Sequence, residues 1–362
     1  MIDIKSFNSL IELTDAFPTE EVCLKYLESL IWEDGVVSPF DPESKVYVCS
    51  NNRCICKNTG KSFNVKTGTI FENTKLPLRK WFMAIWLVLS HKKGISSLQL
   101  SRDIKVTQKT AWFMLQRIRE CLMCKNEGRL ENEVEADETF VGGKNKNRHK
   151  DKKVKKCQGR SFKDKTPVLG MVERKGEVVT RVIKSTSRSE ITPIIQQFVD
   201  KRAVLYTDEW GGYDEIDKSY YHYTVDHGKG QYVNGRIYTN TIEGFWTGLK
   251  RGYIGIYHYM SPKHLQRYAN EFTFRYNTRK VSDFHKFNLL LCNIKYRITY
   301  KQLIARREYN PSSIFFIFTL NNAFSKMYIC SILQILIYIH HNRTMSVHHL
   351  YLDIHNCIFS YF

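Results

Sequence analysis

Residues 240–251 carry the sequence NTIEGFWTGLKR, which predicts the first turns of a helix. One acid, Glu243, lies near the start of this helix. Lys250 follows seven residues later (250 − 243 = 7), so two helical turns place both side chains on one face. A carboxylate can bind a divalent ion, and a cation can hold a phosphate. The helix therefore suits phosphodiester chemistry if further acids converge on it.

Two upstream segments predict strands that each carry such an acid. Residues 134–141 (VEADETFV) contain Asp137 among apolar neighbours, where an acid has little reason to occupy a central strand without a function. Residues 204–210 (VLYTDEW) contain Asp208 at the end of an apolar run, and open α/β sheets bind ligands beyond the ends of their strands. Asp137, Asp208 and Glu243 form the candidate site.

Convergent acids suit this chemistry because two divalent ions can activate a nucleophile and relieve charge at a phosphate. Hard ions such as Mg²⁺ prefer carboxylate oxygens. Asp137 is the best candidate for an acid shared by two ions, since it lies in mid-strand. Its neighbours Glu135 and Glu138 are expected to point to the other face or to lie one step along.

Two members of the candidate site also have ordinary structural interpretations. Asp208 comes shortly before the pair Gly211-Gly212, and aspartate is common in such turns. Asn240 and Glu243 are spaced as a capping pair, with Asn240 as N-cap and Glu243 reaching back from the N3 position. Both interpretations stay open at this point.

Four segments in order carry these residues: VEADETFVGGK, LYTDEWGGY, NTIEGFWTGLKRGYIGIYHYMS and RYANEFTFRYN. Together they resemble bacterial insertion-sequence transposases of the DDE type, specifically the insertion-sequence 1595 family, over residues 26–303. The resemblance implies a ribonuclease H-like catalytic domain that binds two Mg²⁺ (or Mn²⁺) ions through Asp137, Asp208 and Glu243. It also implies transposon ends as DNA substrate, cut-and-join chemistry and a homo-oligomer assembled on DNA.

The resemblance leaves a second candidate for the third metal ligand. Related transposases can use an asparagine near this position, which makes Asn240 a rival of Glu243. We favour Glu243, because three carboxylates neutralise two divalent ions better than two carboxylates and an amide. Lys250 and Arg251 are expected to hold the scissile or a flanking phosphate, the alternative being an ordinary solvated helix face.

The composition favours a polyanionic partner. The 362-residue chain has a formal net charge of +19, which indicates DNA rather than a membrane, since no basic amphipathic helix adjoins an anchor. No stretch reaches the ~20 apolar residues of a membrane span. The ten cysteines show no disulfide-like spacing and no signal peptide precedes them. We expect a cytoplasmic bacterial protein, associated with the nucleoid when bound.

Residues 1–75 predict N-terminal helices followed by a small β-unit. In relatives this unit resembles a zinc ribbon with two Cys-x-x-Cys knuckles. Here the first knuckle reads Ser38-Pro39-Phe40-Asp41 and the second Cys56-Lys57-Asn58-Thr59, so one of four ligands remains. Tetrahedral zinc needs four good ligands, and we therefore expect no zinc, although Cys49, Cys54 and Cys56 could rearrange into a site.

Residues 76–128 predict a helix-turn-helix. Its second helix opens with polar and basic residues that would meet base edges or phosphates: Thr107, Gln108 and Lys109. The alternative is an ordinary helical hairpin. The two cysteines near its end, Cys121 and Cys124, are interpreted as core thiols.

A basic segment at residues 144–165 carries eleven Lys or Arg and two Asp, with almost no apolar periodicity. We interpret it as a loop that clamps the DNA backbone, because it leaves the strand that holds Asp137. The lysines expected to do so are Lys152, Lys153, Lys155 and Lys156. The alternative is a solvated linker.

The fold class expected is α/β, with a ribonuclease H-like mixed sheet and flanking helices at residues 130–282, preceded by the β-unit and the helix-turn-helix. Residues 308–362 are apolar, with almost no charge and poor amphipathic spacing, and are expected to lie outside the fold.

Three functions remain open from the sequence. The first is an active transposase, which the three acids favour. The second is an inactive relic or DNA-binding regulator that keeps only the helix-turn-helix, which the degenerate knuckles and the aberrant tail favour. The third is a metal-dependent nuclease of the same fold that does not transpose.

Overall fold

The computed structural model describes residues 4, 6–50, 52–123, 129–143, 149–153, 164–214, 216, 219–225, 235–295 and 297–305. The apolar tail at 308–362 lies outside the described residues. So do Cys124, Lys155, Lys156 and the side chain of Lys152.

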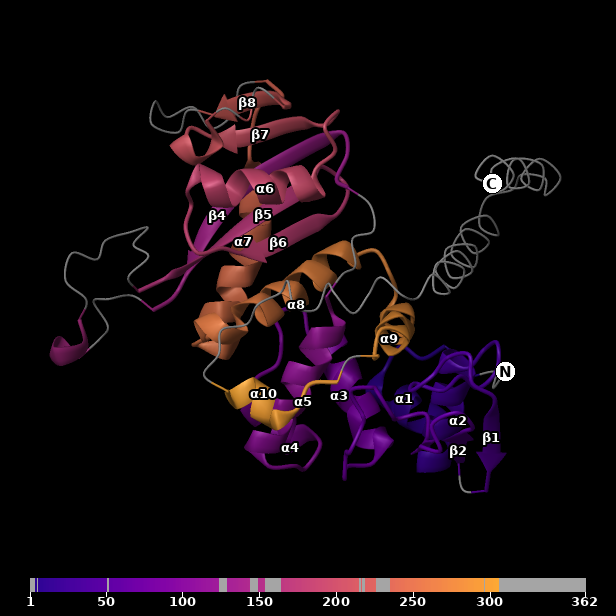
Figure 1. The fold of residues 1–362 in the computed structure, drawn as a ribbon. Helices are drawn as coiled ribbons and strands as arrows, with labels where there is room; N and C mark the ends of the chain where they lie inside the picture. The colour runs from indigo at the N-terminus through magenta and orange to yellow at the C-terminus, as the bar shows by residue number, and fades with distance from the viewer. Residues whose placement is uncertain are drawn as a thin grey trace, which may run out of the picture. The chain divides into compact units, whose positions relative to one another are not determined.

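Residues 133–225 contain a five-stranded mixed sheet (Figure 1). Its strands are β4 (Glu133–Val141), β5 (Thr166–Glu173), β6 (Val178–Val182), β7 (Val204–Asp208) and β8 (Tyr221–Val225). The spatial order is β6-β5-β4-β7-β8. The pairs β4–β5 and β5–β6 are antiparallel, whereas β4–β7 and β7–β8 are parallel. The predicted α/β class with a mixed sheet is confirmed.

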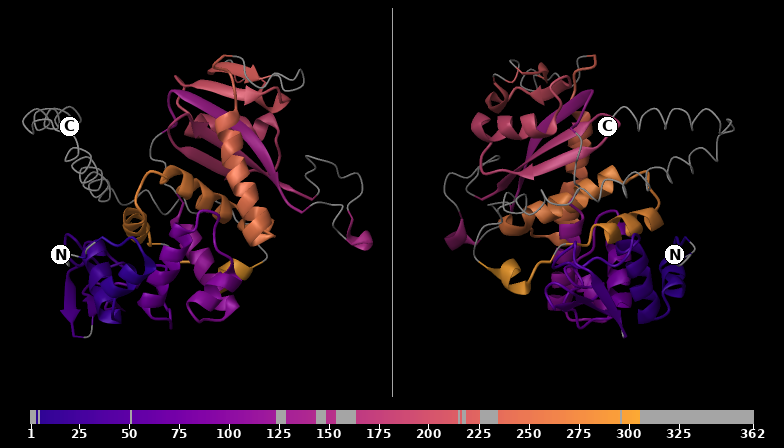
Figure 2. Two further views of the ribbon diagram at one scale, coloured as in Figure 1. Left: turned by 180° about the vertical axis from the view of Figure 1, so that it is seen from behind. Right: turned by 45° about the vertical axis from the view of Figure 1, so that its right-hand side comes forward.

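Helices cover both faces of this sheet, because its strands alternate apolar side chains toward each. Helix α6 (Arg188–Phe198) packs on one face against Val134, Ala136 and other residues of a first core cluster. Helices α7 (Asn240–Gly252) and α8 (Leu265–Asn277) share a second cluster on the opposite face. Thus α6 lies before the sheet in Figure 1, and α7 lies before it when seen from behind in Figure 2.

Short irregular helices complete this region. A π-helix, η6 (Tyr253–Tyr257), continues directly from α7, and the 3₁₀ turn η7 (Pro262–His264) leads into α8. The 3₁₀ turns η2 (Lys150–Lys152) and η3 (Gly211–Tyr213) lie in the connections after β4 and β7. π-helical turns are frequent at functional sites.

The N-terminal region consists of helices with a common core and a small antiparallel sheet with its own cluster. Its helices are α1 (Leu10–Ala16), α2 (Glu20–Ile31), α3 (Leu78–Ser90), α4 (Ser97–Asp103) and α5 (Gln108–Cys121), and its sheet is β1 (Val46–Cys49), β2 (Arg53–Cys56) and β3 (Ser62–Phe63). The core of this region also takes in Phe287, Leu290 and Leu291 of α9 (Asp283–Cys292). A last helix, α10 (Tyr300–Ile304), follows. Among the described residues no helix is long and apolar enough to cross a membrane.

Buried ion pairs join α5 to α8. Arg119 Nε donates to Glu271 Oε2 at 2.6 Å, and both side chains are 1% exposed. Arg267 Nε donates to Glu120 Oε2, also at 2.6 Å. Burial alone would raise the pKa of Glu271, but the charges and hydrogen bonds of its arginine partners lower that pKa to about 2. These two ion pairs thus connect α5, which follows the α4–α5 turn, to α8, which covers one face of the sheet.

Glu271→Gln is expected to lower the free energy of unfolding by about 3–5 kcal/mol, because it leaves the Arg119 charge buried without its partner. Chemical denaturation followed by circular dichroism would measure this loss. The matched control is Glu21→Gln, which removes an exposed ion pair with Lys25 and should leave the unfolding midpoint unchanged. Equal midpoints for the two variants would contradict the prediction.

His264 makes stability depend on pH. Its Nδ1 accepts a hydrogen bond from Arg267 Nη1 at 2.9 Å, which requires an unprotonated Nδ1. Burial and the positive charges of Arg267, Lys263 and Arg119 lower the pKa of His264 to about 4. The unfolded chain, with an ordinary histidine pKa near 6.5, binds more protons between these values. Stability is therefore lost as the pH falls from about 6.5 toward 4.

His264→Asn should weaken this pH dependence, because asparagine keeps an acceptor near the position of Nδ1 and does not titrate. The measurement is the free energy of unfolding between pH 7 and pH 5, above the range in which most carboxylates titrate. We expect a smaller decrease in the variant than in the parent chain. Parallel curves would rule out His264 as the group responsible.

Candidate active site on the α7 face of the sheet

Two neighbouring strands bring Asp137 and Asp208 together. The parallel register pairs Glu133 with Val204 and Glu135 with Tyr206. Two residues further along both strands, Asp137 comes beside Asp208. Side chains alternate between faces, so both acids share the face of Glu135, which α7 covers. Two of the three predicted acids thus lie on one face of neighbouring strands, two residues beyond the last β4–β7 pair.

Helix α7 contacts Asp137 directly. Trp246 Nε1 donates a hydrogen bond to Asp137 Oδ2 at 3.1 Å. Opposite Asp137 on β5 lies Gly170, where an added Cβ would come within 2.5 Å of the Trp246 ring. Only glycine leaves room for the indole to lie over the sheet and reach the acid. This contact orients one oxygen of Asp137.

Asp208 is buried at the end of β7 and begins a turn. Its Oδ1 accepts from the backbone N–H of Trp210 at 3.2 Å, so the turn role that its sequence position suggested is real. The buried phenol of Tyr213 lies near both acids: burial, then the charges of Glu138, Asp137 and Asp208, raise its pKa well above the usual value. The turn role of Asp208 is therefore compatible with a role in the candidate site.

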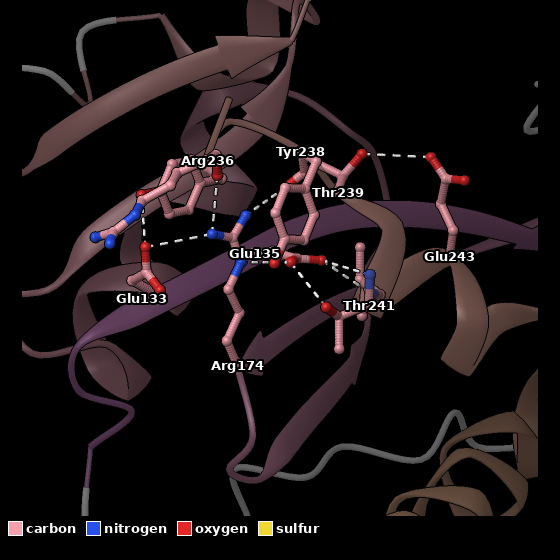
Figure 3. Close-up of polar contacts among 10 residues, drawn as sticks. Glu133, Glu135, Arg174, Arg236, Tyr238, Thr239, Thr241 and Glu243 are labelled. Carbon is pink, nitrogen blue, oxygen red and sulfur yellow. Dashed lines mark hydrogen bonds and ion pairs between the residues drawn. The ribbon is translucent and has the colours of Figure 1, made fainter. Parts of the chain in front are cut away.

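The alternative interpretation of Asn240 and Glu243 as a capping pair does not hold in the structure. The N-cap is Thr239, so Asn240 is the first helical residue and Glu243 lies one position beyond N3. Thr239 makes no capping hydrogen bond to the helix; its hydroxyl instead donates to Glu243 Oε1 at 3.3 Å (Figure 3). Asn240 and Glu243 are both exposed. Neither side chain is committed to capping.

The orphan amides of α7 are capped by Glu135, a residue that sequence analysis misplaced. We expected Glu135 and Glu138 to point to the other face or to lie one step along, but Glu135 lies two residues from Asp137, and two residues along a strand return a side chain to the same face. Its Oε2 accepts from the backbone N–H groups of Thr241 at 2.8 Å and Ile242 at 3.0 Å (Figure 3). Because side chains alternate strictly between the two faces along β4, the sequence already places Glu135 on the same face as Asp137. Glu138, by contrast, does point to the α6 face, toward Tyr213.

The acids fit a hard divalent ion in chemical type but do not form a complete site. Asp137 and Asp208 offer carboxylate oxygens, the ligands that Mg²⁺ prefers. Among the residues that the structure describes, however, no group of three or more His, Cys, Asp or Glu is placed to hold a metal ion. Glu243 therefore does not join the other two acids at ligating distance in this structure.

Among the described residues, the knuckle positions of the β-unit hold no group of three or more His, Cys, Asp or Glu placed to bind a metal ion. Cys56 is fully buried, and although burial would raise its pKa, hydrogen bonds from Ser38, Ser44 and Thr59 lower it to about 6. Hydroxyl groups thus surround the one remaining knuckle thiol. Asp41, at another knuckle position, accepts a hydrogen bond from Asn58. One thiol among hydroxyls does not match the nitrogen and sulfur ligands of structural zinc.

The residues predicted to contact DNA lie at exposed helix positions. Helices α4 and α5 are joined by a four-residue turn, 104–107, and Thr107 caps α5 by accepting from Thr110 N. Gln108 bonds Ser97, and the Lys109 ammonium lies 4.9 Å from the centre of the Tyr300 ring. These first residues of α5 are exposed, whereas most of its remainder is buried.

A second basic surface lies at the end of α7. The exposed side chains of Lys250 and Arg251 line an open groove together with Lys93, Thr247 and Ile254. Lys93 comes from the connection between α3 and α4, so the groove joins the N-terminal region to the sheet domain. Of the four loop lysines, Lys153 is described and exposed.

Comparison with known proteins places the sheet region in a family. A family model described as an ISXO2-like transposase domain matches residues 129–277. An uncharacterized protein in transposable element ISH50 of Halobacterium salinarum is 29% identical over 272 residues, which cover 72% of this chain and 91% of that protein. An uncharacterized transposase-like protein of Haemophilus influenzae is 27% identical over 108 residues, covering 30% of this chain and 86% of that protein.

Two solved structures show a remote likeness. The Mos1 strand transfer complex matches with 13% identity and a TM-score of 0.26, covering 63% of this chain and 82% of that chain. A pre-cleavage Mos1 transpososome matches with 10% identity and a TM-score of 0.17, covering 59% and 79%. The assignment depends on the sequence matches alone: residues 129–277 match the ISXO2-like transposase domain family, and the chain is similar to proteins of transposable elements.

Proposed function

We propose that this chain binds the ends of its insertion sequence and catalyses metal-dependent DNA strand cleavage and strand transfer. The observation that supports the proposal is the parallel pairing of β4 and β7, whose last pair, Glu135 and Tyr206, lies two residues before Asp137 and Asp208. Helix α7, which carries Glu243, contacts Asp137 through Trp246. The strand order supports a ribonuclease H-like assignment for residues 130–282.

In this proposal Asp137, Asp208 and Glu243 would hold two Mg²⁺ or Mn²⁺ ions, with Asn240 as the rival third ligand. Such ions, when bound, supply an activated nucleophile and relieve charge at the phosphate. The chain's own part is to orient the acids: Trp246 holds one oxygen of Asp137, which leaves the carboxylate in a fixed direction.

The basic residues would position the DNA around these acids. Lys250 and Arg251 lie on the same helix as Glu243, and their groove is suited to phosphates near the scissile bond. The first turn of α5, with Thr107, Gln108 and Lys109, would read the transposon end. The lysines Lys152, Lys153, Lys155 and Lys156 would clamp the backbone, and the active form would be a homo-oligomer on DNA.

A cleavage and strand-transfer assay on the element's own ends, with and without Mg²⁺, tests the proposal. Cutting and joining that require the ion would support it. End binding without cutting would indicate a relic or DNA-binding regulator, and cutting without joining would indicate a nuclease. Both outcomes would overturn the proposed activity.

We further propose that the β-unit carries no structural zinc, because Cys56 is surrounded by hydroxyl groups. Elemental analysis of the purified chain should give far less than one zinc per molecule. Addition of a chelator should leave the melting temperature unchanged. A stoichiometric zinc content would refute this proposal.

A further inference from the structure

Glu135 is a fully buried carboxylate whose two oxygens are both occupied by donors. Oε1 accepts from Arg174 Nε at 2.7 Å and from Thr241 Oγ at 2.8 Å. Oε2 accepts from the backbone N–H groups of Thr241 and Ile242 (Figure 3). With two donors at each oxygen, this acid holds α7 rather than a metal ion, although it lies only two residues from Asp137.

These contacts replace the local cap that α7 lacks. The second and third amides of a helix have no intrahelical acceptor and are usually satisfied by the N-cap side chain. Here Thr239 makes no such bond, and a strand residue over a hundred positions away supplies it. A negative charge at this end also suits the helix dipole. The start of α7 is therefore fixed to β4.

Arg174 completes the attachment from the turn after β5. Its buried guanidinium stacks between the rings of Tyr206 and Tyr238, with its central carbon 4.1 and 3.6 Å from their centres. It also donates to the backbone carbonyls of Arg236 at 2.9 Å and Tyr238 at 2.8 Å. Arg174 thus neutralises Glu135 and holds the segment that leads into α7.

We propose that the Glu135–Arg174 pair is a positioning element of the active site. It fixes where α7, with Glu243 and Asn240, lies along β4 relative to Asp137. Helix α7 then meets β4 at two points, Glu135 at its first turn and Asp137 through Trp246. The inference rests on the proposed function, in which the third ligand comes from α7.

The pair would therefore control metal affinity without touching the ions. Mg²⁺ demands near-ideal octahedral geometry, and a site must be held within about 0.5 Å of its productive arrangement. A helix released at its first turn would no longer hold the third ligand in a fixed position relative to Asp137. Loss of such supporting contacts typically weakens metal affinity or activity by about 10–100-fold.

Glu135→Gln tests the inference, because an amide cannot accept on both sides. The NH₂ group of the introduced glutamine must face either Arg174 or the backbone amides of α7. In each case the NH₂ group, which can only donate, meets groups that also only donate. We expect Mn²⁺ binding to the full chain, followed by electron paramagnetic resonance, to weaken by about 10–100-fold. The Mg²⁺ concentration for half-maximal cleavage should rise by a similar factor. Affinity for transposon ends should not change.

Glu120→Gln is the matched control, since Glu120 is also a buried carboxylate bonded to an arginine but lies at the α5–α8 contact. It should lower stability without altering Mn²⁺ affinity. Arg174→Lys keeps the charge and loses the fork and the stacking. Arg174→Lys should also weaken Mn²⁺ binding and raise the Mg²⁺ concentration needed for half-maximal cleavage. If Glu135→Gln does not fold, Arg174→Lys is the variant that tests the inference.

Folded variants at both positions with the parent's Mn²⁺ affinity and Mg²⁺ dependence would overturn the inference. An equal loss of Mn²⁺ affinity in Glu120→Gln would also overturn it, because the effect would then be one of general destabilisation. If the parent chain itself neither binds Mn²⁺ nor cuts DNA, the proposed function fails first, and the two failures remain distinguishable.

Discussion

Asp137→Asn and Asp208→Asn are each expected to bind transposon ends normally and to produce no detectable strand cleavage. An amide is a poor ligand for a hard cation, so either variant should lose the charge that holds the ions. Metal ions contribute several kcal/mol to transition-state stabilisation, and a loss of that size lowers the rate by roughly 10²–10⁴-fold. Folding should be preserved, since asparagine can still accept from Trp246 or Trp210 through its carbonyl oxygen.

The matched control for Asp137→Asn is Glu138→Gln. Glu138 is the next residue on β4, but its side chain points to the α6 face near Tyr213. Its loss should affect stability and leave cleavage largely intact. A second readout separates metal binding from catalysis: saturating Mg²⁺ should raise the melting temperature of the parent chain and of Glu138→Gln, but not that of Asp137→Asn. Efficient cutting by Asp137→Asn would remove this acid from the site.

Prediction from sequence succeeds here where the signal is local. The strands that carry Asp137 and Asp208 are short apolar runs, and a single acid within such a run stands out. Their adjacency also follows once β4 and β7 pair in parallel. Position in a strand and order along the chain are thus enough to find two members of the candidate site.

The parts that could not be predicted depend on contacts between distant residues. Glu135 caps α7 across 106 positions and pairs with Arg174 across 39, so no local spacing announces either contact. The capping interpretation of Asn240 and Glu243 fails for the same reason, because Glu135 accepts from the first amides of α7. Similarly, the requirement for glycine at position 170 becomes clear only from the structure, in which the Trp246 ring leaves no room for a Cβ.

The boundary of the N-terminal region illustrates the same limit. Phe287 of α9 contacts Phe7 and Phe17 with ring centres 5.3 and 6.1 Å apart. A segment that follows the five-stranded sheet in sequence therefore belongs to the core of the first helices. Hydrophobic periodicity predicts that such a helix has an apolar face, but not which partner that face will meet.

The two candidates for the third ligand differ in what each substitution should leave behind. Glu243→Gln is expected to fold, bind transposon ends and fail to cut them. Its fold should survive because Glu135, not Glu243, caps α7, and because the introduced amide oxygen would still accept from the Thr239 hydroxyl. Only the negative charge is lost, and with it a ligand for a divalent ion.

Asn240→Ala is expected to fold as well and to retain most of the cleavage activity. Asn240 is the first residue of α7 and is exposed, and alanine is favourable in a helix. Glu135, not Asn240, caps α7. A loss of activity in Asn240→Ala would therefore not be caused by loss of the helix cap. Melting temperatures of both variants should lie close to that of the parent, which makes cleavage the deciding measurement.

Charge favours Glu243. Two divalent ions carry four positive charges, which three carboxylates offset better than two carboxylates and an amide. Glu243 is exposed and lies on the same helix as Trp246, which contacts Asp137. Mn²⁺ affinity should therefore fall in Glu243→Gln and stay near the parent value in Asn240→Ala. The reverse pattern, with Asn240→Ala stable yet inactive, would assign the third ligand to Asn240.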